Sequence, residues 1–167
     1  RAATSSPLTA TEVQVLIAGG ARGLRCEDPT KLKHAAIRLL NMMAREYREL
    51  LETALDLSSV ARLLNCSETE VQRRAFSAPP LLHAVHLKNG QLLFPQWQFT
   101  SSGEIPHLAS ILTLTGKSVS PLALYRFMRL PNCDLESQGG PLSPRDWLIH
   151  TGNPKPVLDL ARFMTSD

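Results

Sequence analysis

A short stretch of the chain carries hydroxyl, amide and guanidinium side chains suited to contact with nucleic acid. The candidate DNA-binding residues are Ser67, Thr69, Gln72, Arg73 and Arg74, followed further along the chain by Lys88. Cationic side chains neutralise phosphate groups, and hydroxyl, amide and guanidinium groups can hydrogen-bond to the edges of bases. This chemistry requires an element that presents the side chains together on one exposed face.

A helix-turn-helix is the element that the sequence predicts for this purpose, over LSSVARLLNCSETEVQRRAF from Leu57 onward. Ala61 supplies the small residue where the two helices cross, and Asn65 tolerates the positive φ that the turn needs. Val71 is the expected anchor inside the second helix, and Ser67 is its expected N-cap. The second helix of such a motif lies in the major groove of DNA.

The stretch HAVHLKNGQLLFP predicts a β-hairpin directly after the second helix. Asn89-Gly90 is a strong signal for a two-residue turn, which would pair Leu87 with Leu92 and Val85 with Phe94. Lys88 would then lie near the tip, beside the phosphate backbone. The sequence thus predicts a winged helix-turn-helix over residues 57–100.

Helices are expected on both sides of this motif. Thr9 and Glu12 fit a capping box for a short helix that ends at Gly19-Gly20. Asp28-Pro29 begins a long amphipathic helix to about residue 55, which serves either as a core helix or as a dimerisation helix. Four shorter helices are expected after the hairpin, over about 105–115, 121–130, 144–150 and 154–164.

The expected fold class is therefore mostly α, with one β-hairpin. Three parts are predicted: helical residues 1–56, the winged helix-turn-helix of residues 57–100, and a small helical domain of residues 101–167. Whether residues 1–56 pack on the rest of the same chain or on another subunit is left open by the sequence.

The composition argues against a membrane-spanning protein, and its charge supports nucleic-acid binding only weakly. Residues 1–100 hold 12 Lys and Arg against 9 Asp and Glu, whereas residues 101–167 hold 6 of each, so the modest basic excess lies in the first part. We expect no membrane span, no signal peptide and a cytoplasmic location, because no long apolar run occurs and three scattered cysteines suit a reducing compartment. Neither the cysteines nor the histidines have metal-ligand spacing, so no metal site is predicted.

Residues 15–24, VLIAGGARGL, look like the glycine-rich turn of a dinucleotide-binding fold. That fold needs a helix after the glycines and further parallel strands. Arg-Cys-Glu-Asp-Pro follows Leu24 and cannot continue as that helix, and no series of strands follows. We therefore predict no cofactor, and no Ser/His/Asp set lies in a nucleophile-elbow setting, so no catalytic residue is predicted.

Part of the chain resembles the Xre/MbcA/ParS-type antitoxins, and its C-terminal helices resemble their toxin-binding domain. The resemblance rests on FMRLPNCDL, SPRDWLIHTG and VLDLA in that order, preceded by LLFPQWQF, and covers about residues 57–164. The helix-turn-helix with its wing is more similar to excisionase-type or MerR-type DNA readers. The candidate partner-binding residues taken from this resemblance are Asn132, Leu135, Asp146 and Trp147.

The resemblance implies a homodimeric repressor that binds its own operator and neutralises a RES-type toxin that consumes NAD. Two alternatives stay open: a transcription regulator without a toxin, and a protein-binding adaptor that keeps the helix-turn-helix as a scaffold.

Overall fold

The computed structural model describes residues 29–116 and 118–165, and the helix expected at Thr9–Gly19 lies outside them. Contacts divide the chain into two compact units, residues 1–48 and 49–167. The second unit therefore joins the two parts that the sequence separates at residue 100.

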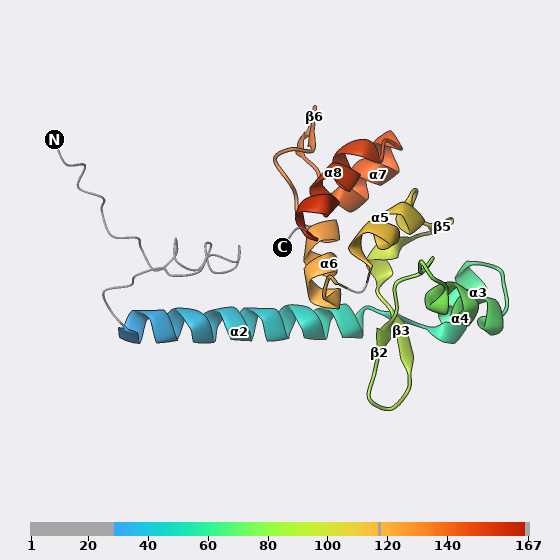
Figure 1. Ribbon diagram of the computed structural model, residues 1–167, viewed down its shortest axis with the longest axis horizontal. Coiled ribbons are helices and arrows are strands. Elements are labelled where there is room, and N and C mark those ends of the chain that lie inside the picture. The colour runs from blue at the N-terminus through green and yellow to red at the C-terminus, as the bar shows by residue number, and fades with distance from the viewer. Residues whose placement is uncertain (1–28, 117, 166–167) are drawn as a thin grey trace. The chain divides into compact units, whose positions relative to one another are not determined.

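The fold is mostly α-helical, as the sequence predicts (Figure 1). The long helix is α2 (Pro29–Glu52), and it ends before residue 55 because Leu55 and Asp56 form strand β1. Strand β1 pairs antiparallel with β3, opposite Phe94 and Leu93. The sequence did not predict this third strand of the sheet.

The helix-turn-helix consists of α3 (Leu57–Leu63) and α4 (Glu68–Phe76), which pack on each other. Asp56 caps α3 by accepting a hydrogen bond from the backbone N–H of Ser59 at 2.8 Å. Val60 and Val71 are fully buried and belong to the core of residues 49–167. The predicted helices and the turn between them are confirmed.

The wing consists of β2 (Val85–His86) and β3 (Leu92–Phe94), which extend away from α3 and α4 as an arm (Figure 1). The predicted register is wrong by one residue, because Val85 lies opposite Leu93 and not Phe94. The N–H of Gly90 donates to the carbonyl of Leu87, and the N–H of Leu87 donates to the carbonyl of Gln91, both at 2.9 Å. These bonds close a loop of three residues instead of two.

The physical reason for the different register lies in the backbone of the turn. A two-residue turn of type I′ needs positive φ at both central residues. Gly90 has a φ of 84°, but Asn89 is not among the described residues with positive φ. The Asn89 side chain instead accepts a hydrogen bond from the N–H of Gln91 at 3.0 Å. Gly90 alone therefore supplies the left-handed residue, as in a three-residue loop with a bulge.

Four helices follow the wing: α5 (Leu108–Thr115), α6 (Pro121–Arg129), α7 (Pro144–Thr151) and α8 (Lys155–Phe163). Ser120 and Ser143 cap α6 and α7 through their hydroxyl oxygens, each with proline at the start of the helix, as expected. Helix α5 begins three residues later than predicted, after His107, which has a φ of 61°. In this unit α8 packs on α5 and α7, and α7 also packs on α6.

Short elements connect these helices, and the sequence did not predict them. A single 3-10 turn, η1 (Gln96–Gln98), is followed by the hairpin β4 (Phe99–Thr100) and β5 (Gly103–Glu104). A second small hairpin, β6 (Glu136–Ser137) with β7 (Gly140–Pro141), precedes α7. Two-residue strands carry too little periodicity to be recognised from sequence.

Candidate nucleic-acid interface

The turn between α3 and α4 fixes the direction of the second helix. Asn65 has a φ of 50°, which confirms its predicted role, and Ala61 is buried where the helices cross. The N–H of Cys66 donates to the carbonyl of Ala61 at 3.0 Å and closes the turn. A short polar side chain tolerates this left-handed conformation better than a β-branched one.

Ser67 begins α4 as its N-cap. Its hydroxyl oxygen accepts a hydrogen bond from the backbone N–H of Glu70 at 3.2 Å. The carboxylates of Glu68 and Glu70 lie in the first turn, where the helix dipole favours negative charge. Ser67 is exposed, but its hydroxyl oxygen already accepts the capping hydrogen bond of α4.

Three of the predicted contact residues share one exposed face of α4. Thr69, Gln72 and Arg73 follow at i, i+3 and i+4, and all three are exposed. Val71, which points to the other side, is fully buried in the core. The helix therefore presents a hydroxyl, an amide and a guanidinium group together to the solvent.

One carboxylate, that of Glu70, binds both arginines of this helix. Arg73 donates from Nε and Nη2 to the two Glu70 oxygens at 2.7 Å each, and Arg74 Nε donates to Oε1 at 2.9 Å. These hydrogen bonds, from Arg73 first and then from Arg74, lower the pKa of Glu70 to about 2. Glu70 is thus ionised at neutral pH and faces two cations.

The two arginines differ in their freedom to leave Glu70. The Arg73 side chain is 63% exposed, whereas that of Arg74 is 30% exposed. Arg74 also donates from Nη1 to Glu104 of β5 at 2.7 Å, so it ties the end of α4 to the β4–β5 hairpin. Arg73 is therefore the arginine suited to an outside ligand, and Arg74 holds the fold together.

Lys88 is exposed and lies in the loop of the wing, within the three residues from Lys88 to Gly90 that the loop spans. The change of register leaves it near the tip, as the sequence predicts. The wing and α4 thus each carry a cation of the predicted set, Lys88 and Arg73.

Phe76 is a large apolar residue of this interface that the sequence did not single out. It is the last residue of α4 and is 62% exposed. The ring of His86, at the end of β2, packs edge-on against it with ring centres 5.3 Å apart. Its spacing could have placed it on this face of α4, because Phe76 follows Arg73, Gln72 and Thr69 by three, four and seven residues.

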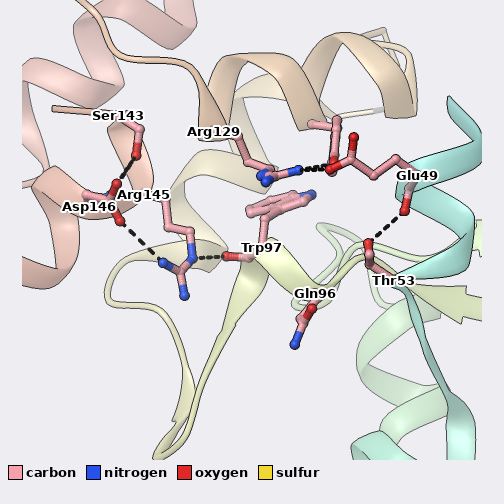
Figure 2. Close-up of a pocket in the computed structure, with 9 residues that line it drawn as sticks. Glu49, Thr53, Gln96, Trp97, Arg129, Ser143, Arg145 and Asp146 are labelled. Carbon is pink, nitrogen blue, oxygen red and sulfur yellow. Dashed lines mark hydrogen bonds and ion pairs between the residues drawn. The ribbon is translucent and has the colours of Figure 1, made fainter. Parts of the chain in front are cut away.

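A polar cavity of about 370 Å³ is a second candidate site in residues 49–167. Its lining residues are Glu49, Thr53, Gln96, Trp97, Tyr125, Arg129, Ser143, Arg145 and Asp146. Figure 2 shows Arg129 paired with Glu49, at 2.9 Å, and Arg145 directed toward the Trp97 backbone. Both cations of the cavity already have protein partners, since Arg129 also donates to the Tyr125 hydroxyl.

Beside this cavity lies a group of interlocked polar side chains that we name the Trp97 cluster: His83, Trp97, Gln98 and Arg145. Gln98 is fully buried, and its amide accepts from the His83 N–H at 2.9 Å and donates to the His83 carbonyl at 2.8 Å. Arg145 donates to the carbonyls of Trp97 and Phe99 at 2.9 and 3.0 Å. The Trp97 cluster joins η1 to α7 and to the segment before the wing.

The ring of His83 lies against that of Trp97, with centres 6.1 Å apart. Its buried Nε2 has no hydrogen-bond partner among the described residues. Burial disfavours the charged imidazolium and lowers the pKa of His83 to about 4. The residue is therefore a neutral packing element at neutral pH.

The residues predicted to bind a protein partner have local structural roles. Leu135 is fully buried, and Asn132 accepts a hydrogen bond from the N–H of Asp134 at 2.9 Å. Asp146 binds the Ser143 hydroxyl at 2.7 Å, and Trp147 Nε1 donates to the carbonyl of Asn153 at 3.0 Å. Leu135 offers a partner no accessible side chain in this conformation.

Within residues 29–116 and 118–165, no group of three or more His, Cys, Asp or Glu residues could hold a metal ion. In the same ranges no helix is both long and apolar enough to cross a membrane. Cys66 and Cys133 are free thiols.

The fold is similar to that in an NMR structure of Rv2175c, with a TM-score of 0.53. The two chains are 23% identical over an alignment that covers 68% of this chain and 81% of that chain. At this identity the likeness concerns the fold. No protein-family profile matches the chain, and neither does any curated protein sequence.

Proposed function

We propose that this chain is a DNA-binding transcription regulator that inserts α4 into the major groove and lays the β2–β3 wing beside the phosphate backbone. One observation carries the proposal: Thr69, Gln72 and Arg73 form an exposed polar face on the second helix of a helix-turn-helix. A helix of this kind fits the width of the major groove of B-form DNA. We assign no catalytic residue.

The residues of this surface divide into two roles by their chemistry. Arg73 and Lys88 neutralise phosphates and release the counterions condensed on them. Gln72 can bond the N6 and N7 edge of adenine with its amide, and Thr69 can bond a base edge with its hydroxyl. Arg74 supports this surface indirectly, because Glu104 and Glu70 hold its guanidinium group.

Selection from a random-sequence duplex library with the full-length chain tests this proposal. We expect a recurrent sequence to be enriched, and its affinity to fall steeply between about 50 and 200 mM salt, as phosphate contacts require. Gln72→Ala should reduce the sequence preference at one base pair. Lys88→Ala should instead lower the affinity for every duplex by the same factor. Enrichment of no sequence, with equal weak binding to every duplex, contradicts the proposal.

A homodimer is part of the same proposal, because it would place two α4 helices about 34 Å apart on a palindrome. Leu40, Met43 and Tyr47 follow one side of α2 at intervals of three and four residues, and all three are exposed. Sedimentation equilibrium should give twice the chain mass, and Leu40→Asp should lower the association. A monomeric wild-type chain would refute the dimer but not the binding of DNA.

The antitoxin role is a finer proposal that the motif-bearing helices support. Helices α6, α7 and α8 begin and end close to the expected positions. Co-expression with a RES-domain toxin tests this role: the chain should restore growth and co-purify with the toxin in a stable complex. Growth arrest in the presence of the soluble chain favours a regulator without a toxin. An adaptor instead predicts no salt-dependent affinity for DNA.

A further inference from the structure

Phe76 is exposed at a place where the fold gives it little apolar cover. It ends α4 with 62% of its surface accessible, whereas Ala75 beside it is half-buried and Val71 is fully buried. Single exposed apolar residues are common on protein surfaces and need no explanation by themselves. The exposure of Phe76 matters because of its position on α4.

Phe76 shares the face of α4 that bears the polar side chains of the proposed interface. It follows Arg73, Gln72 and Thr69 by three, four and seven residues, which is the spacing of one helix face. The buried Val71 lies on the opposite side. A surface that approaches Gln72 and Arg73 from solvent therefore also meets the Phe76 ring.

His86 orients this ring and connects it to the wing. The two rings meet edge-on, with an interplanar angle of 61°. His86 is the last residue of β2 and is itself exposed. The aromatic pair thus bridges α4 and the wing, the two elements assigned to DNA under the proposed function.

The major groove offers one apolar group for such a ring, the C5-methyl group of thymine. Hydrogen-bonding side chains such as Gln72 cannot recognise a methyl group, whereas an apolar ring gains free energy when it removes that group from water. We propose that Phe76 contacts the C5-methyl group of a thymine and thereby selects thymine at one position of each binding site. This inference rests on the proposed function.

Deoxyuridine provides a direct probe, because it differs from thymidine in this methyl group. The full-length chain first selects a duplex from a random-sequence library. Each thymine of that duplex is then replaced in turn by uracil, and the dissociation constants are compared by fluorescence anisotropy. At one position in each site we expect the uracil duplex to bind about fourfold more weakly than the thymine duplex. This is the effect expected when one methyl group is no longer buried.

Variants of Phe76 identify the residue that reads the methyl group. Phe76→Ala should bind the thymine and uracil duplexes equally, and Phe76→Leu should keep part of the difference. Phe163→Ala is the matched control, because Phe163 is also an exposed phenylalanine, on α8, at 78%. This variant should discriminate as the wild type does. Thermal melting of all variants checks that exposed substitutions leave the fold intact.

The outcomes separate this inference from the function on which it rests. If the chain selects a duplex but no thymine position responds to uracil, Phe76 is not a methyl reader and DNA binding stands. Phe76 is also not the methyl reader if Phe76→Ala retains the discrimination. If no duplex is enriched, the proposed function fails and this inference fails with it.

Discussion

The surface of α4 and the Trp97 cluster both contain an arginine held by protein acceptors, yet the two arginines serve opposite purposes. Arg73 bonds to Glu70 on its own helix and is 63% exposed. Arg145 donates to the carbonyls of Trp97 and Phe99, which lie 48 and 46 residues away in the chain. A local, exposed partner can be exchanged for phosphate, whereas partners from distant segments hold those segments together.

This difference teaches that the bonds of an arginine do not by themselves reveal its role. The range of its partners along the chain, together with its exposure, separates a binding cation from a structural one. Changes in the Trp97 cluster should therefore reduce stability, and changes on α4 should alter DNA binding without unfolding the protein.

Gln98→Leu should have the largest effect on stability. It keeps the volume of the side chain but leaves the His83 N–H and carbonyl without their buried partners. Because buried unpaired polar groups are costly, we expect the free energy of unfolding to fall by about 3–5 kcal/mol. Urea denaturation measures this loss. Gln96 is an exposed glutamine nearby, so Gln96→Leu should change the free energy of unfolding by less than about 0.5 kcal/mol. Equal losses in the two variants would show that the buried bonds of Gln98 do not account for its effect.

Acid should weaken the same cluster through His83. Its pKa is about 4 in the folded protein, below the ordinary value of 6.5, because burial disfavours the cation. Between these pH values the unfolded chain binds a proton that the folded protein does not, so stability falls as the pH drops. The loss should reach about 3 kcal/mol near pH 4.

The variant His83→Leu should flatten the stability profile between pH 6.5 and pH 4, measured by urea denaturation at a series of pH values. His86→Leu serves as control because His86 is exposed, and its profile should follow that of the wild type. An unchanged slope in His83→Leu would show that His83 takes up its proton in the folded protein as readily as in the unfolded chain.

Arg73→Ala should weaken DNA binding about tenfold while the stability stays within about 0.5 kcal/mol of the wild type. The salt dependence should also lose the equivalent of one phosphate contact. Arg162→Ala is the matched control, since Arg162 pairs with Asp159 three residues earlier and is 62% exposed. Equal losses in both variants would mean that net charge, and not the surface of α4, governs the affinity.

Glu70→Gln should have the smallest effect, in the direction of tighter binding. This substitution removes the carboxylate that bonds to both Arg73 and Arg74, so DNA affinity should rise a few-fold at low salt. Asp159→Asn, which removes the carboxylate that Arg162 bonds, should leave the affinity unchanged. A weaker Glu70→Gln complex would show instead that Glu70 positions Arg73 for the DNA.

The order of the described helices and the capped starts of α4, α6 and α7 could be predicted because local interactions decide them. Ser67, Ser120 and Ser143 cap helices through bonds to residues three positions ahead, and Asn65 is tolerated at a positive φ. Such effects act within one helical turn, so the local sequence records them. The exposed face of Thr69, Gln72 and Arg73 follows from the same periodicity.

The partners of side chains across the fold could not be predicted, because no local pattern records them. The bond between Arg74 and Glu104 joins residues 30 positions apart, and it decides that Arg74 stabilises the fold. The burial of Gln98 depends in the same way on the segment that carries His83. These roles exist only after distant segments have packed.

The sequence by itself determined a mostly helical chain with a helix-turn-helix, its caps and a hairpin that turns near Gly90. The tertiary structure decided the register of that hairpin, in which Val85 faces Leu93, and the exposure of Phe76 beside His86. The physical reason is the range of the forces. Backbone torsions and caps act over a few neighbouring residues, whereas register, burial and ion-pair partners depend on which surfaces meet when the chain is compact.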